Sequence, residues 1–165
     1  MNIDLKAFAI ERVNDENFSY SEEGHDVRSI LMDVCKLLAG KLNFSASGFG
    51  QAVWPVDVST DLPIFLEQLP SARNALAAGQ SGQIDFYEQG LERSLIFSVE
   101  GADACRVTCQ SWSSWQPDPT EETLELRRLQ EMLANVQATF LRAMEAAFPA
   151  LRDHPWLLIW QKGEA

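Results

Sequence analysis

The sequence predicts an α+β fold in which an antiparallel β-meander (about residues 83–112) shares a sheet with N-terminal strands. A long C-terminal helix and two shorter helical segments pack on one face of that sheet. Two patterns predict this fold. Apolar and polar residues alternate over residues 83–112, as in half-buried strands, and apolar residues recur at helical spacing over 129–148. Because no repeat or linker divides the chain, residues 1–165 are expected to form a single globular domain.

The N-terminal part is expected to supply a strand, a helix and irregular strands. Residues 3–13 alternate loosely and suit an opening strand. Asp26 can cap a following helix whose apolar residues recur at helical spacing. Residues 44–58 are rich in Ser, Gly and Val, which is typical of one or two irregular strands around glycine turns.

A kinked or split helix is predicted from Asp61 to Gly79. Asp61 can cap its start, and Gly79 suits its end. Pro70 lies between them and has no N–H group to continue the helical hydrogen bonds, so it is expected to interrupt the helix.

The meander is expected to contain three strands, at about residues 83–88, 91–99 and 104–112. A two-residue turn at Gln89-Gly90 pairs Ile84 with Leu95. The length of the second turn can be predicted from which side chains it places on the apolar face. A two-residue loop would place Arg106 and Thr108 among the apolar residues, so we predict the three-residue loop 101–103.

The predicted register divides the meander into two faces. The inner face is apolar and contains Ile84, Phe86, Leu91, Leu95, Phe97, Val99, Cys105, Val107 and Cys109. The outer face sets aromatic residues among charges, which is typical of protein-binding surfaces. Its candidate partner-binding residues are Asp85, Tyr87, Glu92, Ile96, Arg106, Gln110 and Trp112. The alternative is that another element covers this face and makes Ile96 and Trp112 core residues.

The long C-terminal helix is expected to begin in the segment Asp118-Pro119-Thr120-Glu121, which resembles a capping box with proline at the first helical position. Its wide apolar stripe should lie across the inner face of the meander. Pro149 is expected to stop the helix, and Pro155 to open a last short one.

The composition excludes several classes of protein. A formal net charge of -11 disfavours nucleic acid and anionic lipid as partners, and favours a basic protein partner. The apolar run 156–160 is too short to span a membrane. Three cysteines at no familiar disulfide spacing, and no signal-peptide pattern, indicate a cytoplasmic protein.

No motif for catalysis, metal binding or a cofactor is found, so no enzymatic activity, metal or cofactor is expected. Cys105 and Cys109 would lie ~13 Å apart on one strand, which is too far for one zinc ion. His25 and His154 stand at predicted helix starts, where capping or exposure accounts for them. Glu88 and Arg93 are expected to share the inner face near the first turn and to form ion pairs.

Four segments resemble the small acidic immunity proteins that accompany bacterial polymorphic toxins and contact-dependent or type VI effectors. These segments are Trp54-Pro-Val-Asp-Val58, Asp85-Phe-Tyr-Glu-Gln-Gly-Leu-Glu-Arg93, Ser111-Trp-Ser-Ser-Trp115 and His154-Pro-Trp156. Together they contain 22 of the 165 residues. The resemblance implies a non-enzymatic inhibitor that binds a cognate toxin domain, occludes its active site and has no catalytic residues.

The sequence therefore favours a protein-binding domain of the immunity type. Two alternatives stay open. The first is a small-molecule-binding domain or an uncharacterised enzyme with a site between the sheet and the helices. The second is a self-associating structural or secretion accessory protein, with a dimer interface that contains Trp112, Trp156 or Trp160.

Overall fold

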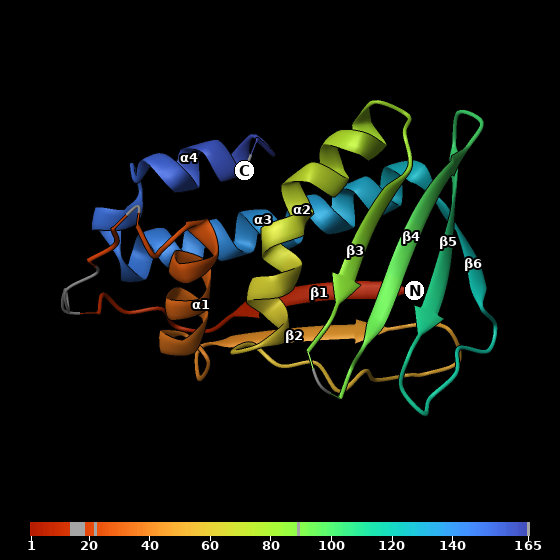
Figure 1. Cartoon of the computed structure of the whole chain (residues 1–165), viewed down its shortest axis with the longest axis horizontal. Coiled ribbons are helices and arrows are strands. Elements are labelled where there is room, and N and C mark those ends of the chain that lie inside the picture. Colours follow the sequence, from red (N-terminus) through yellow and green to blue (C-terminus); the bar gives the residue numbers. More distant parts are fainter. Residues whose placement is uncertain (14–18, 22, 89, 165) are drawn as a thin grey trace.

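A computed structural model describes residues 1–13, 19–21, 23–88 and 90–164 and shows an α+β fold (Figure 1). In chain order its elements are β1 (Asn2–Ala7), α1 (Val27–Leu37), β2 (Leu42–Ser47), α2 (Asp61–Ala77), β3 (Gly82–Phe86), β4 (Arg93–Glu100), β5 (Ala104–Ser111), β6 (Glu121–Glu125), α3 (Leu126–Ala147), the 3₁₀ turn η1 (Pro149–Leu151) and α4 (Pro155–Gln161). The predicted fold class is confirmed.

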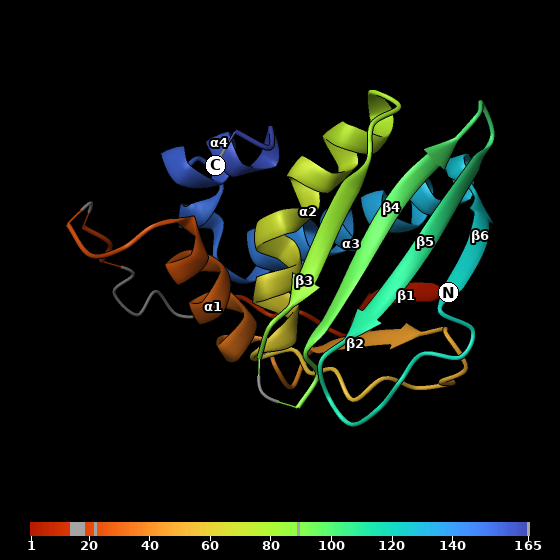
Figure 2. The same ribbon diagram turned by 45° about the vertical axis from the view of Figure 1, so that its right-hand side comes forward.

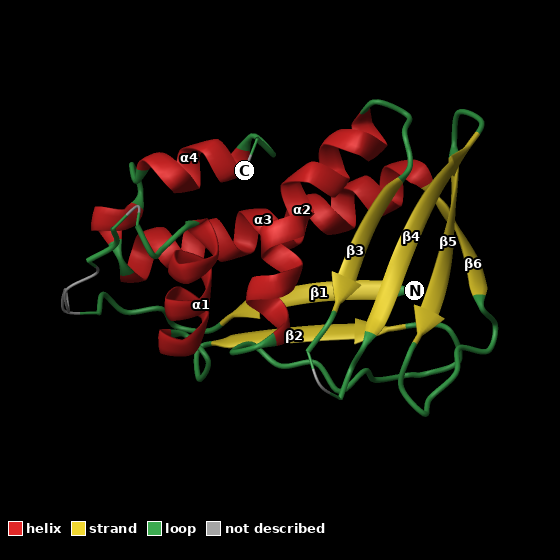
Figure 3. Ribbon diagram, viewed as in Figure 1, coloured by secondary structure: helices red, strands yellow, loops and turns green. Residues whose placement is uncertain are grey.

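The strands form two antiparallel sheets among the described residues, one of order β1-β2 and one of order β3-β4-β5-β6. The prediction that the N-terminal strands share a sheet with the meander is wrong: β1 and β2 pair with each other along their whole length and form a sheet of their own. The helices lie on one side of the meander (Figures 2 and 3). Helix α2 packs along β3, while α3 packs mainly against β1 and α2 and reaches β5 and β6.

Strand β1 is shorter than the predicted strand over residues 3–13. Its alternation ends at Ala7, after which Phe8 is exposed and Ala9 has a φ of 32°. Strand β2 likewise covers only the start of the predicted irregular strands. It ends at a tight turn in which Gly48 and Gln51 bond to each other, and residues 52–58 form a loop.

The predicted register of the meander is confirmed. Ile84 lies opposite Leu95, and Cys109 lies opposite Leu95 on the other side. Glu100 pairs with Ala104 across the three-residue loop. The first connection is longer than predicted, because β3 ends at Phe86 and β4 begins at Arg93. Gln89 of the predicted two-residue turn lies outside the described residues.

The predicted start of the long helix is wrong, because residues 121–125 form β6 and α3 begins at Leu126. Here a period-two pattern overrides the local capping signal. Glu122 and Leu124 point inward between exposed Glu121 and Thr123, so the segment can add a fourth strand beside β5. Glu122 accepts hydrogen bonds from the Met1 amine and the Phe49 N–H, which anchors the strand.

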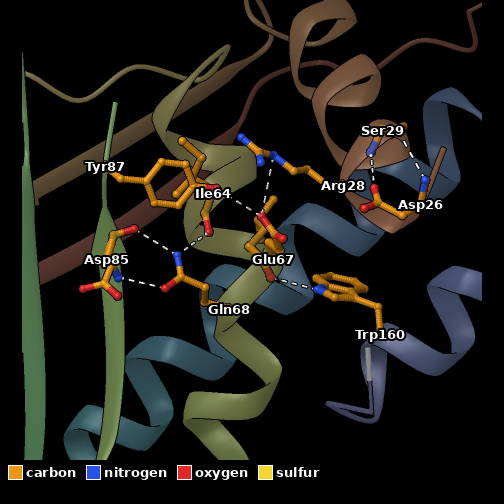
Figure 4. A network of polar contacts seen from close by, with 10 residues as sticks. Asp26, Arg28, Ser29, Ile64, Glu67, Gln68, Asp85, Tyr87 and Trp160 are labelled. Atoms are coloured by element: carbon orange, nitrogen blue, oxygen red, sulfur yellow. Dashed lines mark hydrogen bonds and ion pairs between the residues drawn. The ribbon is translucent and has the colours of Figure 1, made fainter. Parts of the chain in front are cut away.

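Helix α2 continues through Pro70, where an interruption is predicted, and its ribbon bends partway along (Figure 1). Proline removes the N–H that would bond to the Leu66 carbonyl four residues earlier. The indole N–H of Trp160, from α4, donates to that carbonyl instead, at 2.8 Å (Figure 4). Asp61 is the first residue of the helix rather than its cap, since Thr60 occupies the N-cap position.

Three other predicted helix boundaries are confirmed, while α1 ends at Leu37, before the expected end near residues 40–42. Asp26 caps α1 through reciprocal hydrogen bonds with Ser29 (Figure 4). Helix α3 stops before Pro149, and Pro155 stands at the first position of α4 with His154 as its N-cap. Buried apolar side chains of both sheets and of the helices form one core cluster. The predicted partner-binding residues lie outside this cluster, on the outer face of the meander.

Candidate functional site

The candidate site is a hollow of about 450 Å³ at one end of the outer face of the meander. Four of the predicted residues line it, namely Asp85, Tyr87, Glu92 and Trp112. The other three predicted residues, Ile96, Arg106 and Gln110, point to the same face from β4 and β5 but do not line the hollow. The structure thus brings together one aromatic and acidic end of the predicted surface.

Two aromatic rings mark this end of the sheet. Trp112 is 66 % exposed and Tyr87 is 48 % exposed. The alternative that makes Ile96 and Trp112 core residues is therefore wrong for Trp112, while Ile96 is half-buried. The backbone N–H of Trp112 donates to the carbonyl of Glu92 at 3.0 Å. That bond ties the end of β5 to the residue just before β4, where Glu92 has a φ of 40°.

Asp85 is held in place through both its backbone and its side chain. The Gln68 amide on α2 accepts from the Asp85 N–H and donates to the Asp85 carbonyl, each at 2.9 Å (Figure 4). The Asp85 carboxylate accepts from Ser94 and from the Gln83 amide. Gln68 therefore satisfies the backbone groups of Asp85 at the edge of β3, which another chain could otherwise use for strand pairing.

Tyr87 is oriented by charged side chains from two helices. Its hydroxyl donates to Glu67 at 3.4 Å, and the Arg28 guanidinium lies 5.4 Å from the ring centroid. Arg28 and Glu67 also pair at 3.7 Å (Figure 4). Partial burial and then the Glu67 charge raise the pKa of Tyr87, so the phenol stays neutral and can present a hydrogen-bonding hydroxyl.

The outer face carries strongly unbalanced charge. Its outward-pointing carboxylates, from the strands and from Glu92, are Asp85, Glu92, Glu100, Glu121 and Glu125. Among the described outward-pointing residues Arg106 is the one cation. It is already engaged by Glu100, and by Glu121 at 3.7 Å. The face therefore presents excess negative charge to a partner.

The nucleophilic side chains are structural. All three cysteines are free and buried. Burial raises the pKa of Cys35, Cys105 and Cys109, that of Cys109 to about 11, so each remains a thiol. His154 accepts the Trp156 N–H as the cap of α4, and burial lowers its pKa.

A second group of carboxylates lies at the start of α2. Asp61 is 5 % exposed, and it accepts the Asp57 N–H at 2.8 Å. Burial raises the pKa of Asp61 to about 6. The hydrogen bond from Asp57 opposes this rise, and the charges of Asp57 and Glu88 add to it. The geometry is that of a helix-start turn, and Asp61 does not line any of the described surface hollows.

Sequence reasoning missed the environment of Arg93. Parity correctly places it on the inner face, but no ion pair with Glu88 forms among the described residues, and Arg93 is 2 % exposed. Its guanidinium carbon lies 4.4 Å from the Trp54 ring centroid and 3.6 Å from that of Trp115. The sequence did contain one indication of this environment, because Arg93 is a charged residue on a face that is otherwise apolar.

Comparison of the chain with protein-family models, curated proteins and solved structures finds no match. Among the described residues, no group of His, Cys, Asp and Glu is arranged to hold a metal ion. None of the described helices combines the length and the apolar character needed to cross a membrane.

Proposed function

We propose that this chain is a non-enzymatic protein-binding domain, most simply an immunity-type inhibitor that neutralises a cognate bacterial toxin by occluding it. The observation that carries the proposal is the exposure of Tyr87 and Trp112 at one end of the outer face of the meander. There two exposed aromatic rings and the carboxylates of Asp85 and Glu92 surround one hollow. The resemblance of four segments to immunity proteins supports the same proposal.

The proposed partner surface is basic. A Lys or Arg side chain fits a hollow that offers carboxylates for ion pairing and aromatic faces for cation–π contact. Charge complementarity would also steer a basic partner toward a chain of net charge -11. Tyr87 and Trp112 would serve as the amphipathic anchors that are common at interface centres.

A charge reversal in the hollow tests the proposal. The tagged chain is used to recover partners from source cells at low salt, and elution is followed as salt rises. A basic protein recovered near one-to-one should bind the Asp85→Lys/Glu92→Lys variant at least ten-fold more weakly, because two attractive carboxylates become repulsive. The measurement is the dissociation constant of the purified pair across a salt series.

The matched control reverses two exposed carboxylates elsewhere, Glu145→Lys with Asp153→Lys, and makes the same change in net charge. If the two double variants lose affinity equally, only net charge matters and the proposed face is wrong. Occlusion is tested separately. Cells that express the recovered partner should grow with the wild-type chain and fail to grow with the Asp85→Lys/Glu92→Lys variant.

A further inference from the structure

Arg93 is a cation enclosed by aromatic rings on the inner face of the meander. It stands at the start of β4, opposite Phe86 on one side and Ser111 on the other. The rings of Trp54 and Trp115 lie on the guanidinium, and their centroids are 6.2 Å apart. Trp54 also packs against Phe86, so one wall of this enclosure belongs to the aromatic core.

The guanidinium is not satisfied by the protein. Its Nε and Nη1 atoms are closed to solvent and have no hydrogen-bond partner among the described residues. No carboxylate pairs with it in the part of the chain that the structure describes. Aromatic faces compensate part of the desolvation of a cation, but they cannot accept in-plane N–H bonds as an anion does. A buried charge without such a partner requires an explanation.

The two walls of the enclosure differ. Trp54 is 2 % exposed and its indole N–H is fixed to the Gly48 carbonyl at 3.2 Å. Trp115 is only half-buried, and it belongs to the connection between β5 and β6, which contains no helix or strand of its own. Trp115 is therefore the less buried and less regularly held of the two walls, and its displacement would uncover the guanidinium.

We propose that Arg93 is the anchor of a carboxylate-binding site that opens when Trp115 moves away from the guanidinium. A carboxylate matches the planar fork of an arginine and supplies the acceptors that Nε and Nη1 lack. The same group can come from a small organic acid or from a partner's acidic side chain. Arg93 also contributes to the lining of the acidic hollow, but the Trp54 and Trp115 rings that enclose its guanidinium do not line that hollow. The acetate experiment below uses no protein partner, so its failure is distinguishable from a failure of the proposed function.

Nuclear magnetic resonance of the arginine Nε–H groups tests this site in the intact chain. Sodium acetate is titrated against sodium chloride at constant ionic strength, and the Arg93 signal is assigned from the Arg93→Lys spectrum. We expect a saturable shift of the Arg93 Nε–H with a millimolar dissociation constant, together with a change in tryptophan fluorescence. The Trp115→Ala variant, which lacks the movable wall, should bind acetate at least three-fold more tightly.

The source of the carboxylate is distinguished by a second titration with the peptide acetyl-Gly-Asp-Gly-amide. Tighter binding than acetate indicates a polypeptide ligand, and weaker binding indicates a small acid. An Arg93 signal that stays constant up to about 100 mM acetate in both wild type and Trp115→Ala would overturn the proposal. So would equal fluorescence titrations of wild type and Arg93→Met, a variant that keeps the length of the side chain without its donors.

Discussion

At the scale of single residues, Asp61 shows how burial makes stability depend on pH. Its folded-state pKa of about 6 lies above the ordinary value, so the folded chain holds this proton more tightly than the unfolded chain does. The free energy of unfolding should then fall as pH rises from about 4 to about 6, and the loss persists above that range.

We expect Asp61→Asn to remove this loss. An amide keeps an oxygen that accepts the Asp57 N–H but carries no charge to desolvate. The variant should match the wild type near pH 4 and exceed its free energy of unfolding by about 1–2 kcal/mol near pH 7. Urea unfolding across that pH range measures the difference. A variant that is less stable at pH 7 would mean that the charged hydrogen bond outweighs desolvation.

The neighbouring Asp57 changes the pH dependence of stability in the opposite direction to Asp61. Although burial acts to raise its pKa, hydrogen bonds from Thr60 and Ser59 lower it below the ordinary value. Its contribution to stability is therefore present at neutral pH and lost as pH falls below about 4. Because the lowered pKa keeps Asp57 largely ionised above about pH 4, its titration disturbs the comparison of Asp61→Asn with wild type little between about pH 4 and pH 7.

At the scale of elements, the bend of α2 depends on a contact with the C-terminal helix. Trp160 is 1 % exposed and supplies the hydrogen bond that the Leu66 carbonyl loses to Pro70. Trp160→Phe should lower the free energy of unfolding by about 2–4 kcal/mol, from the unpaired carbonyl and the smaller ring together. Thermal or urea unfolding measures this loss.

Pro70→Ala provides the test of mechanism, because it restores the backbone N–H that Leu66 can accept. Trp160→Phe should cost less in the Pro70→Ala background than in the wild type. Trp156→Phe on the same helix, at a half-buried position, controls for the loss of an indole in general. Equal costs of Trp160→Phe in both backgrounds would show that only packing matters.

The hydrogen bond between Trp160 and Leu66 illustrates which parts of the fold could be predicted from the sequence and which could not. Side-chain parity is a local property of a strand pair, so it sufficed to predict the register that places Val107 opposite Phe97. The continuity of α2 depends on an indole 94 residues from Leu66 in the chain, and no local pattern contains it. Strand β6 was not predicted because residues 118–121 resemble a helix start, whereas in the fold residues 121–125 pair with β5.

In the candidate site too, some features follow from local sequence patterns and others depend on tertiary packing. Parity alone brought Asp85, Tyr87, Glu92 and Trp112 to one face, and the structure adds that they share a hollow. The supports of that hollow, above all the Gln68 amide on the edge of β3, come from tertiary packing that the sequence does not display. Arg93 was placed on the correct face, but its aromatic neighbours lie in loops whose paths no periodicity predicts.

At the scale of the whole molecule, net charge and specific contacts should respond oppositely to salt. A formal charge of -11 on 165 residues opposes the compact state through self-repulsion, which salt screens. The ion pairs that would be weakened in return are largely exposed, as in Arg127 with Glu125 and Glu131. Exposed pairs contribute little to stability.

We therefore expect the free energy of unfolding to rise by about 0.5–1 kcal/mol between 20 and 300 mM NaCl, while affinity for a basic partner falls over the same range. Urea unfolding gives the first quantity through its midpoint at constant slope, and titration calorimetry gives the second. If both fall together, local ion pairs rather than net repulsion govern the stability of the chain. If affinity does not change, the partner is not recognised through the acidic outer face of the meander.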